Sequence, residues 1–266
     1  MISVVMAAYD RAATLPRAVD SVLGQSCRDW ELIVVDDASA DETAAVLQGY
    51  DDPRIHVFRH GRRRGAAAAR NSGLDLMTGA WFAIVDPDDE IVPDALSTLL
   101  DTAAQTGAAT VVCNCLDART GRPTGRGHDI EGWKSEADTA RLSVEGWGMH
   151  TTELLGGLRF DERLPGMECV LWTKLAHVAG RRYFVSSALR VSHGAGDGHV
   201  ATARRPRHEQ AAIDRALVDD PAYLEILRAT DPGEYHRLLR RVWRAKVMSK
   251  IVGDRVSSSP ERDAAA

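Results

Sequence analysis

The stretch SVVMAAYDRAATLPRAVDSVLGQSCRDWELIVVDD, residues 3–37, contains the pattern that decides the fold. Two short apolar runs, Ile2–Met6 and Glu31–Val35, are rich in β-branched residues, which is typical of strands buried on both faces of a parallel sheet. Between them, apolar residues recur at helical spacing from Leu15 to Leu23. A strand, a helix and a second strand in this order predict an α/β fold.

The same alternation continues along the next part of the chain. The predicted elements are a short helix after Asp41, a strand over Ile55–Phe58, an alanine-rich helix that ends near Gly79, a strand over Trp81–Val85, a helix over Pro93–Gln105 and a strand over Ala109–Leu116. In such folds the ligand binds at the carboxyl ends of the strands. Two acidic loops, Asp36–Asp37 and 86–90, follow strands in this way, so we expect the ligand site there.

The second half of the chain is less regular. Glycine, proline and charge interrupt the pattern after residue 116, a helix is expected near Val170, and residues 210–252 read as helices broken near Pro221 and Pro232. We therefore predict a domain over 1–205, a C-terminal helical extension over 206–255 and a disordered tail over 256–266. Within the domain, 1–116 and 117–205 would form two halves.

Composition narrows the class of protein. The 266 residues carry a formal charge of -5 and a hydrophobic fraction of 44%, which is ordinary for a soluble domain and gives no reason to expect nucleic acid as a partner. The four cysteines, Cys27, Cys113, Cys115 and Cys169, lack the paired spacing of a zinc site and are expected to be reduced thiols. The first apolar run is too short for a signal peptide or a membrane span, so we predict a cytoplasmic protein without an integral membrane segment.

The segment AIVDPDDEIVPDAL, residues 83–96, raises a question of charge. Its clustered carboxylates raise one another's pKa unless a cation or a set of hydrogen-bond donors holds them. Mg²⁺ and Mn²⁺ prefer oxygen ligands and commonly bind one or two carboxylates together with phosphate oxygens. The segment therefore indicates a site for a divalent cation, and the alternative is an acidic turn that caps the helix beginning near Pro93.

Four stretches in this order resemble family 2 of the inverting nucleotide-sugar glycosyltransferases, which have the GT-A fold. The stretches are SVVMAAYDRAATLPRAVDSVLGQS, DWELIVVDDASADET, RGAAAARNSGL and FAIVDPDDEIVPDAL. The resemblance implies a mostly parallel central sheet flanked by helices, with 1–116 as the nucleotide-sugar-binding half and 117–205 as the acceptor-binding half. It also implies transfer of a sugar from a UDP- or dTDP-sugar, with N-acetylglucosamine as one candidate sugar, assisted by Mn²⁺ or Mg²⁺.

The resemblance also implies roles for residues of the donor site. Tyr9 would pack against the base, Asp37 would accept a hydrogen bond from it, and Arg70 would pair with the diphosphate or the acidic loop. Ala7 would also line the nucleotide-sugar site. The first of these stretches departs from the commoner family pattern Pro-Thr-Tyr-Asn at Ala7, Ala8 and Asp10, and Ala8 lacks the hydroxyl of the family's Thr.

The resemblance also implies roles for the acidic loop, residues 86–90, and for His193. Asp88 would contact the metal directly, Asp86 would face the ribose or a metal-bound water, and Asp89 would support them. His193 would complete the metal or diphosphate site. The arginine run 62–64 reads either as a solvated loop or as a phosphate clamp.

An inverting transfer needs a base that takes the acceptor's proton. In the family this base is the Asp of a Glu-Asp pair, and here GMECVLWTKL, residues 166–175, places Met167 and Glu168 at that pair. Glu168 is thus the candidate catalytic base. Two alternatives remain: Glu168 as an acid at a helix N-terminus, and the whole chain as a catalytically silent nucleotide-sugar-binding module.

The acceptor is the least specified part of the reaction, and we expect transfer to a hydroxyl or an amine of a soluble acceptor. Trp147 and His150 lie where similar enzymes form the acceptor pocket, although both types of residue also pack in cores. A small molecule, a carrier-bound precursor and a glycan all remain open as acceptors. Near the C-terminus, an apolar stripe at helical spacing around Leu238 and Val242 is expected to dock on the chain's own domain, and the alternatives are a membrane surface or a homodimer through these helices.

Overall fold

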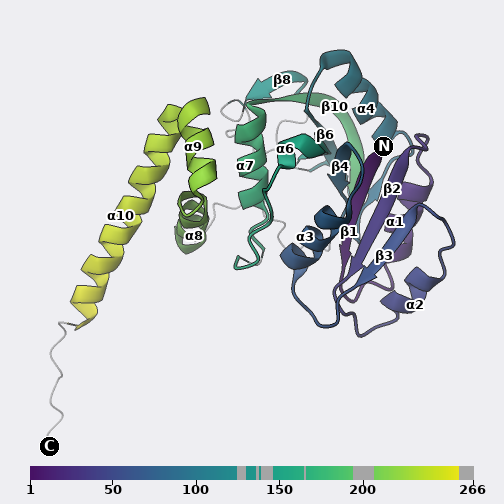
Figure 1. Cartoon of the computed structure of the whole chain (residues 1–266), viewed down its shortest axis with the longest axis horizontal. Coiled ribbons are helices and arrows are strands. Elements are labelled where there is room, and N and C mark those ends of the chain that lie inside the picture. Colours follow the sequence, from purple (N-terminus) through teal and green to yellow (C-terminus); the bar gives the residue numbers. More distant parts are fainter. Residues whose placement is uncertain (125–129, 136–137, 139–145, 165, 194–206, 258–266) are drawn as a thin grey trace, which may run out of the picture. The chain divides into compact units, whose positions relative to one another are not determined.

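The computed structural model describes residues 1–124, 130–135, 138, 146–164, 166–193 and 207–257 (Figure 1). The chain divides into two compact units, Met1–Arg204 and Arg205–Ala266.

The first unit begins with the strand, helix and strand that the sequence predicts. Strand β1 (Ile2–Ala8) pairs in parallel with β2 (Trp30–Asp36), and the helix α1 (Leu15–Leu23) connects them. Nearly all residues of both strands are buried, which explains why the two runs are continuously apolar rather than alternating. A proline in the first turn suits the start of α1, because backbone N–H groups at this position have no intrahelical partner and the N–H that proline lacks is not missed.

The remaining elements of the unit complete one sheet flanked by helices. They are α2 (Thr43–Gln48), β3 (Ile55–Arg59), α3 (Ala66–Leu76), β4 (Trp81–Ile84), β5 (Glu90–Ile91), α4 (Ala95–Thr106), β6 (Thr110–Asp117), β7 (Arg122–Pro123), β8 (Gly132–Ser135), β9 (Gly146–Thr151), α6 (Thr152–Leu155), α7 (Cys169–Ala179) and β10 (Arg181–Ser192). The sheet order is β3-β2-β1-β4-β9-β6-β10-β5, with β7 beside β6 and β8 beside β10. Strands β1–β4 are mutually parallel, and β6 is parallel to β10.

The central sheet separates two hydrophobic clusters. On one face Val4 and Met6 of β1 pack with apolar residues of α1 and α4. On the other face Val5 packs with Leu74 of α3 and Leu171 of α7. This alternation along β1 follows the two-residue period of a strand, and it places helices on both faces of the sheet (Figure 1). The predicted fold class is confirmed.

Strands β9 and β10 were not expected from the sequence. Strand β9 lies antiparallel between β4 and β6. It approaches β6 so closely at Gly148 that a Cβ atom there would lie 2.2 Å from the carbonyl oxygen of Val111. Glycine is required at this position, and glycine content is what obscures the strand pattern in the sequence.

In its described residues, 207–257, the second unit consists of the helices α8 (Arg207–Val218), α9 (Pro221–Thr230) and α10 (Pro232–Ser257). Pro221 and Pro232 are the first residues of α9 and α10, a position where the fixed φ angle of proline is favourable. The predicted helix breaks near these two prolines are therefore confirmed. The core of the unit contains Leu217, Tyr223, Leu227 and Leu238, all buried. No helix in the described residues is both long and apolar enough to span a bilayer.

Candidate active site

The site lies at the carboxyl ends of β1, β2 and β4, where Tyr9, Asp37 and Asp86 follow their strands. The parallel register pairs Ala8 with Asp36, and the next residue, Asp37, donates its backbone N–H to the carbonyl of Ala8 at 2.8 Å. Three chain segments that are far apart in sequence therefore end at the same edge of the sheet. The sequence prediction of a site at this edge agrees with this arrangement.

Asp37 organises the loop that follows β3. Its buried carboxylate accepts hydrogen bonds from the backbone N–H groups of Arg64 at 2.8 Å and Gly65 at 2.7 Å, and it lies 2.6 Å from Nδ1 of His60. Gly65 has φ +96°, a conformation that glycine adopts without strain. A carboxylate has about four acceptor positions, and these three contacts fill three of them. The hydrogen bond from a base to Asp37 stays a prediction.

Tyr9 has a neighbour that sequence reasoning missed. The guanidinium of Arg63 lies 3.9 Å from the centre of the Tyr9 ring, which is the geometry of a cation–π contact. Ala7 is the last but one residue of β1 and is partly buried beside Ala69 of α3. The arginine run 62–64 is thus more than a solvated loop at its middle residue, because Arg63 covers one face of Tyr9.

The carboxylates of the acidic loop are held by side chains and backbone from other elements. Asp86 accepts from Nη2 of Arg70 at 2.8 Å, and Asp89 accepts from the backbone N–H of His193 at 3.1 Å. The α1 residue Arg17 donates to the backbone carbonyl of Asp88 at 2.5 Å. Helix α4 begins after Asp94, downstream of the loop. These contacts favour a ligand-facing loop over the alternative of a helix cap.

Arg190 of β10 is a third arginine at this loop, after Arg70 and Arg17, and sequence reasoning missed it. Its guanidinium lies 3.7 Å from Oδ2 of Asp86 and 3.5 Å from Oδ2 of Asp89, and its side chain is only 12% exposed. Part of the positive charge that the acidic loop requires is therefore supplied by the chain itself. The one available signal was the position of Arg190 three residues before His193.

Asp89 nonetheless remains short of compensating charge. Burial raises the pKa of Asp89, and the neighbouring Asp86 and Asp88 raise it further, while Arg190 and the N–H of His193 act in the opposite direction. Asp88 is partly exposed, so its carboxylate is accessible to a ligand from solvent. An additional cation beside Asp86 and Asp88 would relieve this repulsion.

Arg70 joins the acidic loop to the candidate base. It donates from Nη2 to Asp86 and from Nη1 to Oε1 of Glu168, both at 2.8 Å, across 98 residues of sequence in the second case. Burial alone would lower the pKa of Arg70, but the charges of Asp86 and Glu168 outweigh it and raise the pKa. The guanidinium therefore stays charged and fixes the two carboxylates on either side of it.

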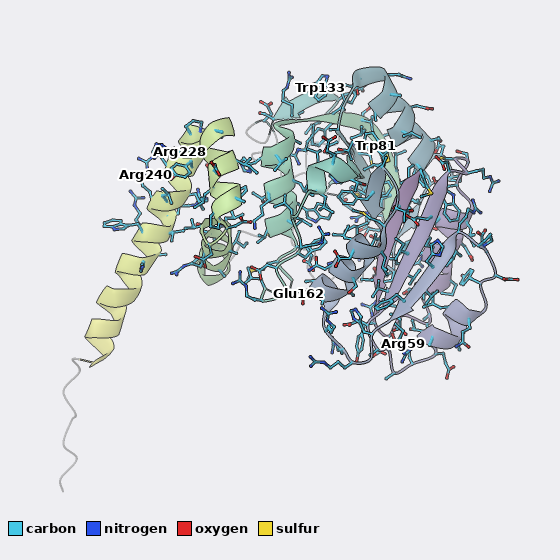
Figure 2. The ribbon with its side chains drawn as sticks, in the orientation of Figure 1. Arg59, Trp81, Trp133, Glu162, Arg228 and Arg240 are labelled. Atoms are coloured by element: carbon cyan, nitrogen blue, oxygen red, sulfur yellow. The ribbon has the colours of Figure 1, made fainter. Side chains whose placement is uncertain are left out.

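Glu168 is the N-cap residue of α7, but its side chain makes no capping hydrogen bond. Its carboxylate is 30% exposed and contacts Arg70 instead. The loop before α7 is itself anchored to α3, because Asn71 exchanges hydrogen bonds with the backbone of Phe160 and contacts Glu162, which Figure 2 labels. These contacts favour a positioned functional group over a simple helix-terminal acid.

His193 lies beside the acidic loop, but its ring contacts a different carboxylate. Nε2 of His193 is 2.7 Å from Oε1 of Glu90, and its backbone N–H binds Asp89. Its role toward a metal or diphosphate stays a prediction. His199, which follows it, lies outside the described residues.

Trp147 and His150 belong to β9 and support the site from within the fold. Trp147 is buried and donates from Nε1 to the carbonyl of Ile84 at 2.7 Å, directly before the acidic loop. The ring of His150 lies between Phe82 and Trp172, with centroid distances of 5.3 and 5.5 Å. These positions favour packing roles for both residues, and their contact with an acceptor stays a prediction.

The position of His150 predicts a loss of stability in acid. Burial, followed by the charge of Arg182, lowers the pKa of His150 from 6.5 to about 3. As the pH falls through this interval the unfolded chain binds a proton that the folded chain does not bind, so the free energy of unfolding decreases, by about 2 kcal/mol at pH 5. In His150→Phe, urea denaturation at pH 7 and pH 5 should show a smaller decrease. Equal decreases in His150→Phe, wild type and the exposed-site control His56→Gln would contradict this.

The residues of the loop fit a divalent metal of the Mg²⁺ or Mn²⁺ type. Asp86 and Asp88 offer carboxylate oxygens, the donors that these ions prefer. Among the described residues, no three Asp, Glu, His or Cys side chains are grouped closely enough to hold an ion by themselves. The coordination of a bound metal would therefore have to be completed by other oxygens, such as those of a diphosphate.

Comparison with known proteins agrees with this geometry. Residues 3–154 match the profile of the family described as Glycosyl transferase family 2. A Campylobacter jejuni protein named GalNAc(5)-diNAcBac-PP-undecaprenol beta-1,3-glucosyltransferase is 33% identical over 199 residues, which cover 71% of this chain and 63% of that protein. The matched region thus spans less than two thirds of that relative.

Two solved structures share the fold. Residues 1–349 of Staphylococcus aureus TarS in complex with UDP-GlcNAc superpose with a TM-score of 0.74 at 17% identity, covering 91% of this chain and 71% of that one. The Pyrobaculum calidifontis mannosyltransferase PcManGT in complex with GDP-Man and Mn²⁺ gives a TM-score of 0.59 at 19% identity, covering 97% and 76%. At these identities the likeness establishes the GT-A fold.

Proposed function

The chain belongs to glycosyl transferase family 2, and from that premise we propose that it moves a sugar from a UDP-sugar to an acceptor hydroxyl with inversion at the anomeric carbon. The observation that carries the proposal is the double contact of Arg70. One guanidinium binds Asp86 of the donor loop and Glu168 of the base helix, both at 2.8 Å. The two groups that an inverting transfer needs are thereby supported by one residue.

The donor would be bound at the ends of β1 and β2. Tyr9 and Arg63 present a stacked pair of flat groups for the base, and Asp37 retains one acceptor position for a base N–H group. Uracil and thymine offer the same N–H edge, so UDP is the proposed nucleotide and dTDP the second choice. Glucose and N-acetylglucosamine are the proposed sugars, supported by the names of the Campylobacter relative and the TarS complex.

The diphosphate would lie at the acidic loop. Asp86 and Asp88 would hold Mn²⁺ or Mg²⁺, which neutralises charge on the departing diphosphate. Arg70 and Arg190 lie behind the loop and fix Asp86. Because both arginines are largely buried, they keep the loop in place before a donor binds, which reduces the cost of ordering it during binding.

Glu168 would act as the base. Arg70 binds Oε1, so Oε2 is the oxygen that would accept the proton of the acceptor hydroxyl. The acceptor oxygen forms a bond with the anomeric carbon as the bond from that carbon to the diphosphate oxygen breaks. The nucleoside diphosphate leaves, and the proton remains on Glu168 until solvent removes it.

The acceptor is proposed to be a sugar hydroxyl of a glycan carried on a polyprenyl diphosphate. The support is the name of the Campylobacter relative, which acts on an undecaprenol-linked glycan. Small-molecule and carrier-bound acceptors are the competing choices.

A donor panel tests the proposal. Nucleotide release is measured with UDP-glucose, UDP-N-acetylglucosamine and GDP-mannose, each with Mn²⁺, and with or without a diphosphoundecaprenol-linked GlcNAc acceptor. We expect acceptor-dependent release of UDP from one of the two UDP-sugars. Preference for GDP-mannose would overturn the nucleotide assignment, and UDP binding without turnover on any acceptor would favour the silent binding module.

A further inference from the structure

The helix α10 has a strongly basic outer side. Between Tyr235 and Gly253 the sequence contains six Lys and Arg residues and no Asp or Glu, although the whole chain has a formal charge of -5. The positive charge is therefore concentrated in one segment and does not reflect the general composition. Such a segment attracts a polyanionic surface over a distance of about one Debye length.

The geometry of α10 separates a packed side from an open side. Leu238 is buried, and α10 packs on α8 and α9 within the second unit. His236, Arg240 and Trp243 recur at spacings of four and three residues, so they share one side of the helix, and all three are exposed. Figure 2 shows Arg240 on α10. Of the predicted apolar stripe, Leu238 is buried in the core of this unit and Val242 is half-buried, whereas Trp243 is exposed.

The open side combines charge with an aromatic ring. Arg237, Arg240, Arg244 and Lys246 are exposed there, and Trp243 has 65% of its surface exposed. Trp is the side chain enriched at the boundary between water and lipid, because one end of its indole is apolar and the other can donate a hydrogen bond. A basic side with a central exposed Trp has the charge and the chemistry that complement an anionic bilayer.

Two other basic side chains of α10 form ion pairs within the unit. Arg241 pairs with buried Asp214 at 2.9 and 3.1 Å and with Glu234 at 2.9 Å, so it stabilises the packing of α8 and α10. Arg237 pairs with Glu234 at 2.6 Å. Arg240 and Arg244, which flank Trp243, are the residues best placed to meet an external anion.

We propose that the open side of α10 from His236 to Lys246 binds the surface of a membrane that contains anionic phospholipids. The contact is peripheral: the guanidinium groups lie at the phosphates and the Trp243 ring lies among the headgroups. If the proposed lipid-linked acceptor is correct, which is the one part that rests on the proposed function, this contact would bring the enzyme to the surface where its acceptor is embedded.

Vesicle co-sedimentation of the full chain tests the proposal. Vesicles of phosphatidylcholine alone are compared with vesicles that also contain phosphatidylglycerol. Wild type should sediment with the anionic vesicles and lose this binding at high salt. The affinity of the double variant Arg240→Glu/Arg244→Glu for anionic vesicles should fall by at least roughly thirtyfold. Each basic residue near such a surface contributes about 1 kcal/mol, and 1.4 kcal/mol is tenfold. Trp243→Ala should weaken binding without altering its salt dependence.

Matched controls separate this contact from folding and from catalysis. Arg28→Glu/Arg122→Glu makes the same charge change at two exposed positions of the first unit and should bind vesicles like wild type. UDP binding, measured on each variant, reports on the first unit, so loss of vesicle binding with intact UDP binding isolates α10. Failure of wild type to bind anionic vesicles, or equal binding to both kinds of vesicle, would overturn the proposal. So would self-association of the chain that the Arg240→Glu/Arg244→Glu variant abolishes while vesicle binding is retained.

Discussion

Replacing Glu168 with glutamine is expected to reduce kcat by about 10²- to 10⁴-fold, the usual contribution of a positioned general base. Glutamine keeps the size of the side chain and an oxygen for Nη1 of Arg70, so the local geometry is retained while the proton acceptor is lost. The affinity for UDP should stay near the wild-type value, because Tyr9 and Asp37 are unchanged. Steady-state kinetics with a UDP-sugar and calorimetric titration with UDP measure the two effects separately.

Two further variants control this result. Glu153→Gln removes an exposed carboxylate in α6, outside the site, and should leave kcat unchanged. Glu168→Asp keeps the carboxylate but shortens the side chain by one methylene, and should retain more activity than Glu168→Gln. A Glu168→Gln enzyme with unchanged kcat would show that another group takes the acceptor's proton.

Replacing Arg70 with methionine should have the largest effect on stability. The side chain of Arg70 is 15% exposed and pairs with two carboxylates, so its removal leaves Asp86 and Glu168 without their shared cation. The side chains of Asp86 and Glu168 are 36% and 30% exposed and Asp86 keeps Arg190, so the loss of unfolding free energy should lie between that of an exposed and that of a buried ion pair, about 1 to 3 kcal/mol. We also expect loss of turnover, because both the donor loop and the base lose their support. Urea denaturation gives the first effect and single-turnover kinetics give the second.

A second arginine that forms an ion pair with helix α3 provides a control for Arg70→Met. Arg159 pairs with Asp75 of α3 at 2.8 Å, but Asp75 is largely exposed, so Arg159→Met should cost less than about 1 kcal/mol. The double variant Arg70→Met/Glu168→Gln should lose less stability than the sum of the two single changes, because the two residues interact directly. Equal costs for Arg70→Met and Arg159→Met would contradict the central position assigned to Arg70.

The first half of the fold was predictable because its signals are local. The runs that form β1 and β2 are buried on both faces and therefore read as continuous apolar segments, and the acidic loop directly follows β4. The candidate base was found through a motif at the start of α7. Each of these features depends on residues that are close in sequence.

The missed features depend on contacts between distant segments. Strand β9 has the period of a strand only in Trp147 and Met149, and its glycines, which the close approach to β6 requires at Gly148, mask that pattern. Arg190 meets the acidic loop only because β10 lies near it in the sheet, about a hundred residues later in the chain. The sequence therefore predicted an external cation for the loop, and the family resemblance implied Arg70 as a partner of the loop or the diphosphate, but neither could show that Arg190 also lies beside it.

The most direct test of the metal-diphosphate site is a thermal-shift measurement with UDP and with GDP, each with and without Mn²⁺, on wild type, Asp88→Asn and Asp101→Asn. Asp101 is an exposed residue of α4 and serves as the control. A ligand at a hundred times its Kd adds about 2.7 kcal/mol to stability, and each kcal/mol raises Tm by about 2 to 4 °C in a chain of this size. We expect UDP with Mn²⁺ to raise the Tm of wild type and Asp101→Asn by several degrees, and to have little effect on Asp88→Asn. No shift in wild type, or the same shift in Asp88→Asn, would contradict the account.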